Sequence, residues 1–134
     1  MAKFKLLVDT DIIIDYLKGV KPARSLFNSN DVDIYCSILS KKELFSKRGL
    51  RNSERKKITR LISGIKVLKI DDGINQKYSL LINKYGERQN LIADYLIAAT
   101  AWAKNLPLLT RNIKHLKRIN EIKLSPAYGY DGEV

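Results

Sequence analysis

The first seventeen residues constrain the fold most, because an apolar run ends there at a cluster of carboxylates. The segment Phe4–Val8 is short and rich in bulky or β-branched side chains, which predicts a buried strand. Apolar residues then recur at helical spacing over Ile13–Leu17, which predicts a helix capped by Thr10 or Asp11. Asp9 therefore falls at the carboxyl end of a strand, the edge of a parallel α/β sheet where ligands bind.

Strands and helices are predicted to alternate along the rest of the chain. Further strands are predicted at residues 33–37, 67–70, 106–109 and 122–124. The predicted helices are a short one at 23–27, one opening at Ser40–Glu43 with a Ser-x-x-Glu capping pattern, one after Ser53, one over Ile74–Tyr85 and one over Leu91–Ala103. Because parallel neighbours need crossover connections, this alternation predicts a parallel sheet covered by helices on both faces.

The length and composition favour an ordinary globular protein. We expect a single domain over residues 1–134, with a core that needs no disulfide. No apolar run approaches the length of a membrane span, and the basic amino terminus lacks a signal-peptide core, so we expect a cytoplasmic protein without membrane contact. The single Cys36 lies in a predicted strand, which favours a buried structural thiol over a nucleophile.

Positive charge is concentrated in one part of the sequence. The formal net charge is +11, and the segment Lys41–Arg60 alone holds nine basic residues and two acidic ones. Such a segment attracts polyanions, of which nucleic acid is the commonest in a cell, although a solvated helix face that keeps the protein soluble explains it about equally well. Charge alone therefore suggests a partner and no reaction.

Three acids are predicted to meet at the carboxyl edge of the sheet. Asp9 follows the first strand, Glu43 follows the second, and Asp94 is the only charged residue in the apolar helix predicted at Leu91–Ala103. Each has a structural explanation alone, as a helix cap, part of a capping box or a charge at a helix amino end. Together, with no Gly-rich phosphate loop and no His/Cys ligand spacing in the sequence, they favour Mg²⁺ or Mn²⁺, which bind carboxylate oxygens.

Four segments in order resemble the PIN-domain nucleases, and among these the VapC-type toxins of prokaryotic toxin–antitoxin pairs. The matching segments are Leu7–Asp11, Ser37–Leu44, Asp94–Ala101 and Leu109–Asn112. The resemblance covers essentially the whole chain, and its specificity comes from the order and spacing of the four segments rather than from any one of them.

The resemblance implies a fold, an activity and partners. The fold is a three-layer α/β/α sandwich on a five-stranded parallel sheet. The activity is that of an Mg²⁺- or Mn²⁺-dependent endoribonuclease, which hydrolyses RNA with a metal-activated water, and the protein is a homodimer held inactive by a cognate antitoxin.

The resemblance also assigns roles to single residues. Asp9, Glu43 and Asp94 match the acids that hold the metal, and Asn112 stands where the family often has a fourth acid, so a second metal site is in doubt. Supporting roles fall to the hydroxyls of Thr10 and Thr110 and to the phosphate-facing cations Arg111 and Lys114. His115 follows the strand end by several residues, which favours a surface histidine over a general base.

Two alternatives stay open at this point. Asp9-Thr10-Asp11 also looks like the nucleophile motif of haloacid-dehalogenase-type phosphatases, with Asp71 and Asp72 as a late acidic pair. That interpretation leaves Glu43 and Asp94 without a role. The other alternative, motivated by Asn112, is a catalytically weak PIN-like module that binds RNA or protein.

Overall fold

The computed structural model describes residues 3–88, 91–126 and 128, and has four parallel strands with helices on both sides. The elements in chain order are β1 (Phe4–Val8), α1 (Thr10–Leu17), α2 (Lys21–Phe27), β2 (Val32–Ser37), α3 (Ile38–Phe45), α4 (Asn52–Ser63), β3 (Lys66–Leu68), α5 (Asp72–Tyr85), α6 (Ile92–Lys104), β4 (Leu108–Leu109) and α7 (Ile113–Leu116). No helix of the described chain is long and apolar enough to cross a membrane.

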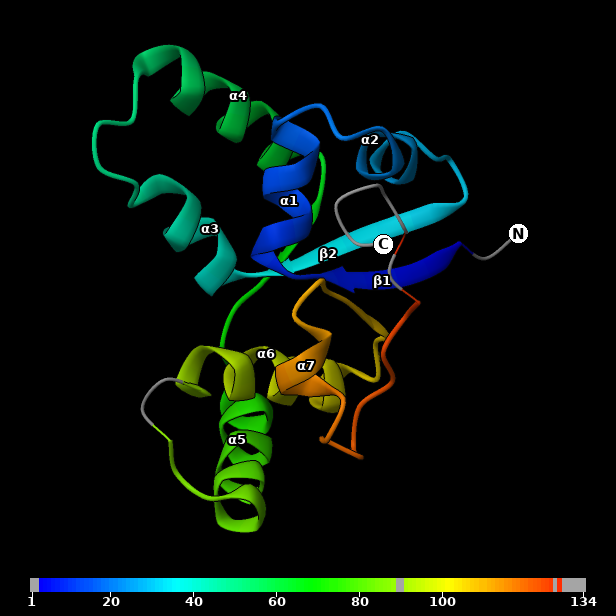
Figure 1. Ribbon diagram of the computed structural model, residues 1–134, viewed down its shortest axis with the longest axis vertical. Helices are drawn as coiled ribbons and strands as arrows, with labels where there is room; N and C mark the ends of the chain where they lie inside the picture. Colours follow the sequence, from blue (N-terminus) through cyan, green and yellow to red (C-terminus); the bar gives the residue numbers. More distant parts are fainter. Residues whose placement is uncertain (1–2, 89–90, 127, 129–134) are drawn as a thin grey trace.

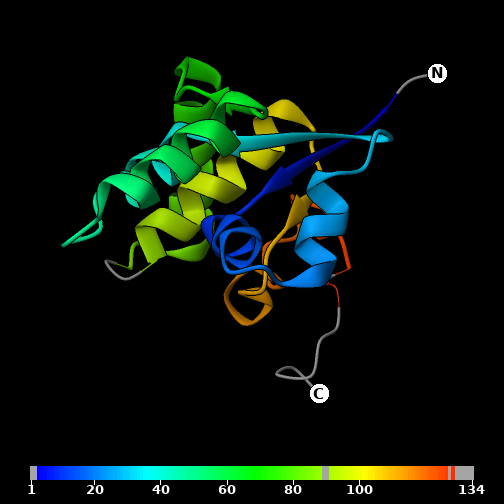
Figure 2. The ribbon, with the colours of Figure 1, turned by 90° about the horizontal axis from the view of Figure 1, so that it is seen from above.

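The strand order β3-β2-β1-β4 determines which face each helix covers. Right-handed crossovers from β1 to β2 and from β2 to β3 move in one direction, so α1 to α4 lie on one face of the sheet. The crossover from β3 to β4 returns past β1, so α5 and α6 lie on the opposite face, together with α7 (Figure 1). Figure 2 shows the same layers from above.

Alternating side chains of β1 supply the two halves of the core. Leu7 is fully buried toward α5 and α6, whereas Leu6 and Val8 are buried toward α1, α3 and α4. A strand buried on both faces must be apolar on both, which explains why the buried part of β1, Leu6–Val8, is a continuous apolar run. Cys36 is buried in the second of these clusters, and burial raises the pKa of its thiol to about 11, as fits a structural thiol.

The prediction of a fifth strand is wrong. Leu124 forms a single parallel bridge with Leu108, and the predicted strand at 122–124 goes no further. Its partner β4 is only two residues long, and Pro107 and Pro126, which flank the paired segment, have no N–H to donate. The sandwich is therefore built on four strands, with this bridge at its edge.

Two predicted helix starts are also wrong. The cap of α1 is Asp9 itself, whose Oδ1 accepts a hydrogen bond from the Thr10 N–H at 2.8 Å. Helix α3 begins directly after β2, because the Ser37 hydroxyl accepts the Leu39 N–H at 3.1 Å and caps it. Ser40 and Glu43 consequently lie inside α3, and Glu43 is not part of a capping box.

Candidate active site

The strand order places the candidate site at the point where the sheet changes direction. Strands β2 and β4 lie on either side of β1, and the crossovers that lead to them run on opposite faces, so the helices diverge beyond the carboxyl ends of β1 and β4. This divergence is the usual position of a ligand crevice in an open α/β sheet. Asp9 follows β1 there and Thr110 follows β4.

Asp9 is held by two donors. Its Oδ1 accepts the Thr10 N–H, and its Oδ2 accepts the Thr110 hydroxyl at 2.8 Å. Thr110 is fully buried, and its oxygen also accepts the Asn112 N–H at 3.0 Å. Its single proton goes to Asp9 rather than to Asp11, whose Oδ2 lies farther from the hydroxyl, at 3.5 Å. The predicted supporting role of Thr110 thus corresponds to a direct contact with Asp9.

Glu43 reaches the site from the last turn of α3. The Thr10 hydroxyl lies 3.0 Å from Glu43 Oε1 and 2.8 Å from the hydroxyl of Ser40, one helical turn earlier in α3. Since a hydroxyl has one proton and two acceptor positions, Thr10 can donate to Glu43 while it accepts from Ser40. Ser40 and Thr10 are both buried, so this chain of hydrogen bonds fixes α3 against α1.

Asp94 lies in the first turn of α6 and contacts the segment after β4. The Asn112 amide nitrogen lies 3.1 Å from Oδ1 and 3.3 Å from Oδ2 of Asp94, and His115 Nδ1 lies 3.1 Å from Oδ2. An ionised carboxylate only accepts hydrogen bonds, so both neighbours are donors. His115, interpreted from the sequence as a surface residue, is half-exposed and also part of this cluster.

Asp11 and Arg111 form a second connection between α1 and the segment after β4. Asp11 Oδ2 accepts the Arg111 backbone N–H at 2.9 Å, while Asp11 Oδ1 is buried and has no hydrogen-bond partner among the described residues. The Arg111 guanidinium pairs with Asp15, one turn further along α1. Arg111, predicted to meet phosphate, is therefore engaged by a carboxylate in this structure, whereas Lys114 is exposed on α7.

Burial and neighbouring charges shift the pKa values of the acids themselves. Burial raises the pKa of Asp9, and the charges of Asp94 and Glu43 raise it further, against the hydrogen bonds from Thr110 and Thr10, which lower it. Burial, followed by the charge of Asp9, raises the pKa of Asp11 to about 6. Carboxylates from β1, α3 and α6 therefore lie close enough to repel one another.

The donor set suits a hard divalent cation, although the side chains do not converge on one point. Among residues 3–88, 91–126 and 128, no three Asp, Glu, His or Cys side chains are arranged to hold a metal ion. Glu43 is turned to Thr10, and Asp94 is turned to Asn112 and His115. The unpartnered Asp11 oxygen and the mutual repulsion of the acids are nevertheless what a cation would relieve.

Asp15, Ser40 and His115 contact residues of the site but were not predicted to do so from the sequence. For Asp15 and His115, the spacing in the sequence could have indicated the contact. Asp15 follows the buried Ile12 by three positions, so a charged residue lies on the apolar face of α1. His115 follows Asn112 by three positions, which brings both to the same side of one helical turn. Ser40 fitted the predicted capping box, so nothing in the sequence indicated its contact with Thr10.

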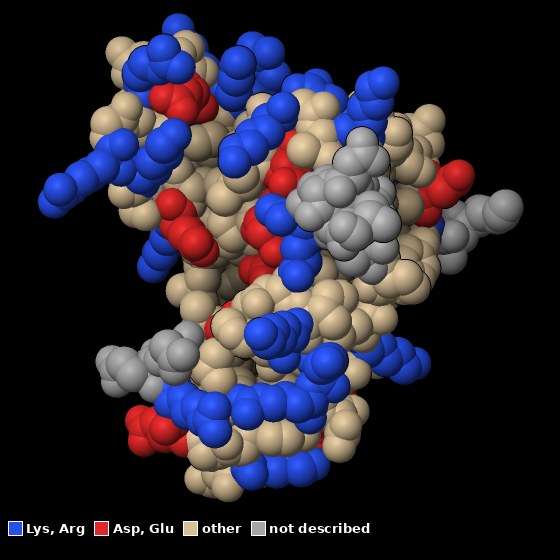
Figure 3. All heavy atoms as spheres, in the orientation of Figure 1, with Lys and Arg blue, Asp and Glu red and all other residues tan. Residues whose placement is uncertain are grey.

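Basic side chains surround the acidic site. Figure 3 shows acidic atoms near the middle of one face, with Lys and Arg around them. Part of the positive charge just before α4 is neutralised, because Glu54 of α4 accepts from Arg51 at 3.2 Å and from Lys47 at 3.3 Å. In the part of the chain that the structure describes, Lys57 and Arg60 form no ion pair.

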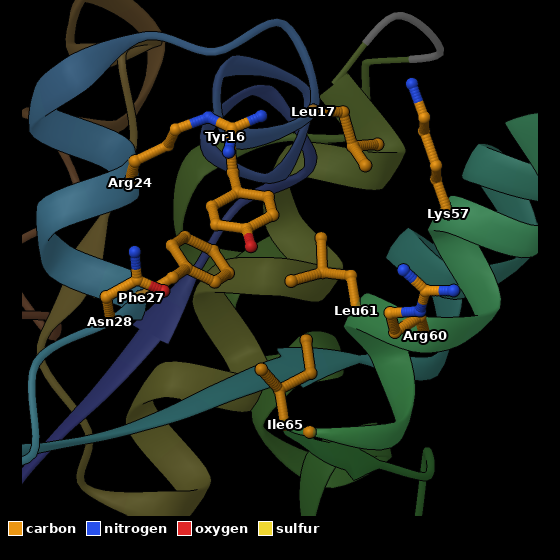
Figure 4. Close-up of a pocket in the computed structure, with 10 residues that line it drawn as sticks. Tyr16, Leu17, Arg24, Phe27, Asn28, Lys57, Arg60, Leu61 and Ile65 are labelled. Atoms are coloured by element: carbon orange, nitrogen blue, oxygen red, sulfur yellow. The ribbon is translucent and has the colours of Figure 1, made fainter.

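Two cavities lie along α1, one of them lined by Glu43 and the other by basic side chains. One, of about 440 Å³, lies between α1, α3 and α4 and is lined by Thr10 and Glu43 as well as apolar side chains. The other, of about 370 Å³, lies between α1, α2 and α4, and its charged lining residues are Arg24, Lys57 and Arg60 (Figure 4). Leu17 lines both cavities, so they are neighbours along α1.

Comparison with known proteins gives consistent matches over nearly the whole chain. The PIN domain family model matches residues 6–122. The ribonuclease VapC10 of Mycobacterium tuberculosis is 34% identical over 122 residues, covering 88% of this chain and 90% of the relative. The ribonuclease VapC1 of Methanocaldococcus jannaschii is 33% identical over 123 residues, covering 90% and 85%.

Solved structures share the fold. The VapBC2 structure from Rickettsia felis, bound to a DNA fragment from their promoter, contains a chain that matches with a TM-score of 0.78 at 23% identity, covering 94% of this chain and 100% of that chain. A chain of a toxin–antitoxin complex from Klebsiella pneumoniae matches with a TM-score of 0.71 at 24% identity, covering 92% and 99%.

Proposed function

Because this chain belongs to the PIN-domain family, we propose that it is a metal-dependent endoribonuclease and the toxin of a toxin–antitoxin pair. The observation that carries this proposal is that Asp9, Glu43 and Asp94, from three separate elements, lie close enough where the sheet changes direction for the charges of the last two to raise the pKa of Asp9. Relatives at 33–34% identity bear the name ribonuclease, and solved structures of the same fold are toxin–antitoxin complexes. The partners we propose are accordingly an RNA substrate, a cognate antitoxin and a second copy of the chain.

The three acids are the proposed ligands of Mg²⁺ or Mn²⁺. When bound there, a divalent cation supplies Lewis acidity: it lowers the pKa of water and offsets negative charge on the scissile phosphate. Thr110 holds Asp9 and Thr10 holds Glu43 from the protein side. Asn112 donates to Asp94, which assigns it to orienting that carboxylate rather than to holding the cation through its own oxygen.

The basic residues are proposed to hold the RNA strand. The cavity lined by Glu43 and the cavity lined by Lys57 and Arg60 both border Leu17, so a strand cut at the acids can extend along α1 toward these cations. Lys114 lies exposed on α7, the helix that begins next to Asn112, and is placed to contact a phosphate on that side. By resemblance to the PIN-domain nucleases, the products should carry a 5′ phosphate and a 3′ hydroxyl.

The test is RNA cleavage by the purified protein with Mg²⁺ or Mn²⁺, compared among single carboxylate variants. Asp9→Asn, Glu43→Gln and Asp94→Asn should each lower the cleavage rate about 10²–10³-fold. Asn is as good a helix cap as Asp, so Asp9→Asn should fold normally. The matched control is Asp33→Asn, which removes a carboxylate from partly exposed ion pairs with Lys3 and Lys66 at the other end of the sheet and should leave cleavage unchanged.

Two results would decide against this function. Metal-independent cleavage that leaves a 2′,3′-cyclic phosphate would show that the ribose hydroxyl is the nucleophile. RNA binding without cleavage in Mg²⁺ or Mn²⁺ would identify a PIN-like binding module. The phosphatase alternative is set aside, because the family match extends over Glu43, Asp94 and Thr110, for which a phosphatase has no use.

A further inference from the structure

Asp15 is a buried carboxylate that the proposed reaction does not use. It is 4% exposed and lies in the second half of α1. The Arg111 guanidinium binds it at two points, with Nε 2.9 Å from Oδ2 and Nη2 3.2 Å from Oδ1. The Tyr128 hydroxyl donates to the same Oδ2 at 2.6 Å. Asp15 thus connects α1 to two residues that lie 96 and 113 positions further along the sequence, Arg111 and Tyr128.

Stability alone is a weak explanation for this cluster. Removing a carboxylate and a guanidinium from water costs free energy that their attraction only partly returns, and apolar side chains of similar size often stabilise such a position equally well. The bidentate geometry does supply orientation, because the planar guanidinium fits a carboxylate in one way. The cluster therefore fixes the orientation of the Arg111 side chain.

The neighbours of Arg111 show what this orientation serves. Thr110 donates to Asp9, the Arg111 N–H donates to Asp11, and Asn112 donates to Asp94. Three consecutive residues thus contact three different acids. They follow β4, which is only two residues long and gives the segment little support from the sheet.

We propose that Asp15 is a positioning residue of the acidic site, which acts by anchoring Arg111 and thereby the segment 110–112 on which Asp9 and Asp94 depend. The proposal rests on the proposed function for its effect on cleavage, but the anchoring itself does not require it. Asp15 contacts neither the cation nor the RNA in this account. Its effect reaches the site through Arg111, in the way that outer partners of metal ligands commonly tune a site.

The main test compares Asp15→Asn with the wild type in three measurements. Mutating a residue that contacts a metal ligand from outside typically changes affinity or rate 10–100-fold. Asp15→Asn should therefore lower kcat by about that factor and leave the KM for RNA within about twofold. Mn²⁺ binding, measured by electron paramagnetic resonance, should weaken about tenfold. In the metal-free protein, the NMR signals of the Thr110 N–H and the Asn112 side-chain amide should shift. The matched control is Leu81→Val, a buried substitution on α5, which should lower the Tm and leave the kinetic constants, the Mn²⁺ affinity and these NMR signals unchanged.

Arg111→Lys provides a second variant should Asp15→Asn fail to fold. It keeps the charge but loses the two-point contact, so it should reproduce the loss of kcat and of Mn²⁺ affinity with KM unchanged. A raised KM with unchanged kcat would mean that Arg111 binds RNA directly, and would overturn the proposal. So would an Asp15→Asn protein that differs from the wild type in Tm alone. If the wild type binds Mn²⁺ but cleaves no RNA, the proposed function fails, while the Mn²⁺ affinities and NMR signals still decide the role of Asp15.

Discussion

Lowering the pH from about 7.5 to about 5 in metal-free buffer should stabilise this protein, because the Asp11 carboxyl binds a proton more tightly in the folded state. Burial, and then the charge of Asp9, raise the pKa of Asp11 from 3.8 to about 6. Between these two values the folded protein holds a proton that the unfolded chain has released. Stability therefore rises as the pH falls through 6 toward 3.8, the reverse of a carboxyl whose pKa is lowered by folding.

The expected size of the effect follows from this window. One pKa unit corresponds to about 1.4 kcal/mol, and the interval from about 6 to about 5 covers one unit, so Asp11 contributes about 1 kcal/mol once its partial exposure is allowed for. For a chain of 134 residues this free energy corresponds to a rise in Tm of about 4 °C.

The assay is urea unfolding, followed by circular dichroism at both pH values with a chelator present, for the wild type and Asp11→Asn. Asp9 also has a raised pKa, and it is coupled to Asp11 through their charges, so the difference between the two proteins reports Asp11 together with this coupling. The pH-dependent gain of Asp11→Asn should be smaller by about 1 kcal/mol. Equal gains in the two proteins would refute the reasoning, because some other group would then carry the proton.

Two further predictions concern the basic surface and the hydroxyl that holds Asp9. Replacing Lys57 and Arg60 together by Ala should make the binding constant for single-stranded RNA less dependent on salt, reducing the slope of log K against log salt by about 1.4. The control Lys5→Ala, at the end of β1 away from the acids, should leave this slope unchanged. An unchanged slope in the double variant would assign these cations to another partner. Thr110→Val removes a fully buried donor to Asp9 and should lower the free energy of unfolding by about 2–3 kcal/mol. Thr110→Ser keeps the hydroxyl and should therefore keep most of the wild-type stability. Equal urea midpoints for these two variants would contradict the assigned hydrogen bonds.

The sequence was most informative where local rules apply. β1 was predicted with its observed bounds, and α5 ends before Gly86 as predicted, since a glycine with φ of 88° suits a helix end. The start of α3 was less predictable. Ser37 and Ser40 both fit a cap by residue type, and only the end of β2 at Ser37 decides between them.

The candidate site divides in the same way. The placement of Asp9 and Thr110 at strand ends follows from the pattern of apolar runs, because strand ends are local features. The partners of Arg111 and His115 could not be read from the pattern. Each is chosen by a contact across 21 residues or more, and many side chains of the right chemistry compete for such contacts.

The opening stretch Phe4–Leu17 shows where the division lies. By itself, the sequence determined that a buried strand ends at Asp9 and a helix follows, because side-chain period and capping act over a few residues. Only the tertiary structure decided that Glu43 turns to Thr10 and Asp94 to Asn112, that Asp11 becomes a buried carboxyl with a raised pKa, and that Asp15 pairs with Arg111. These outcomes depend on the order β3-β2-β1-β4, which brings the segment after β4 against α1, and on burial, which no single segment produces alone.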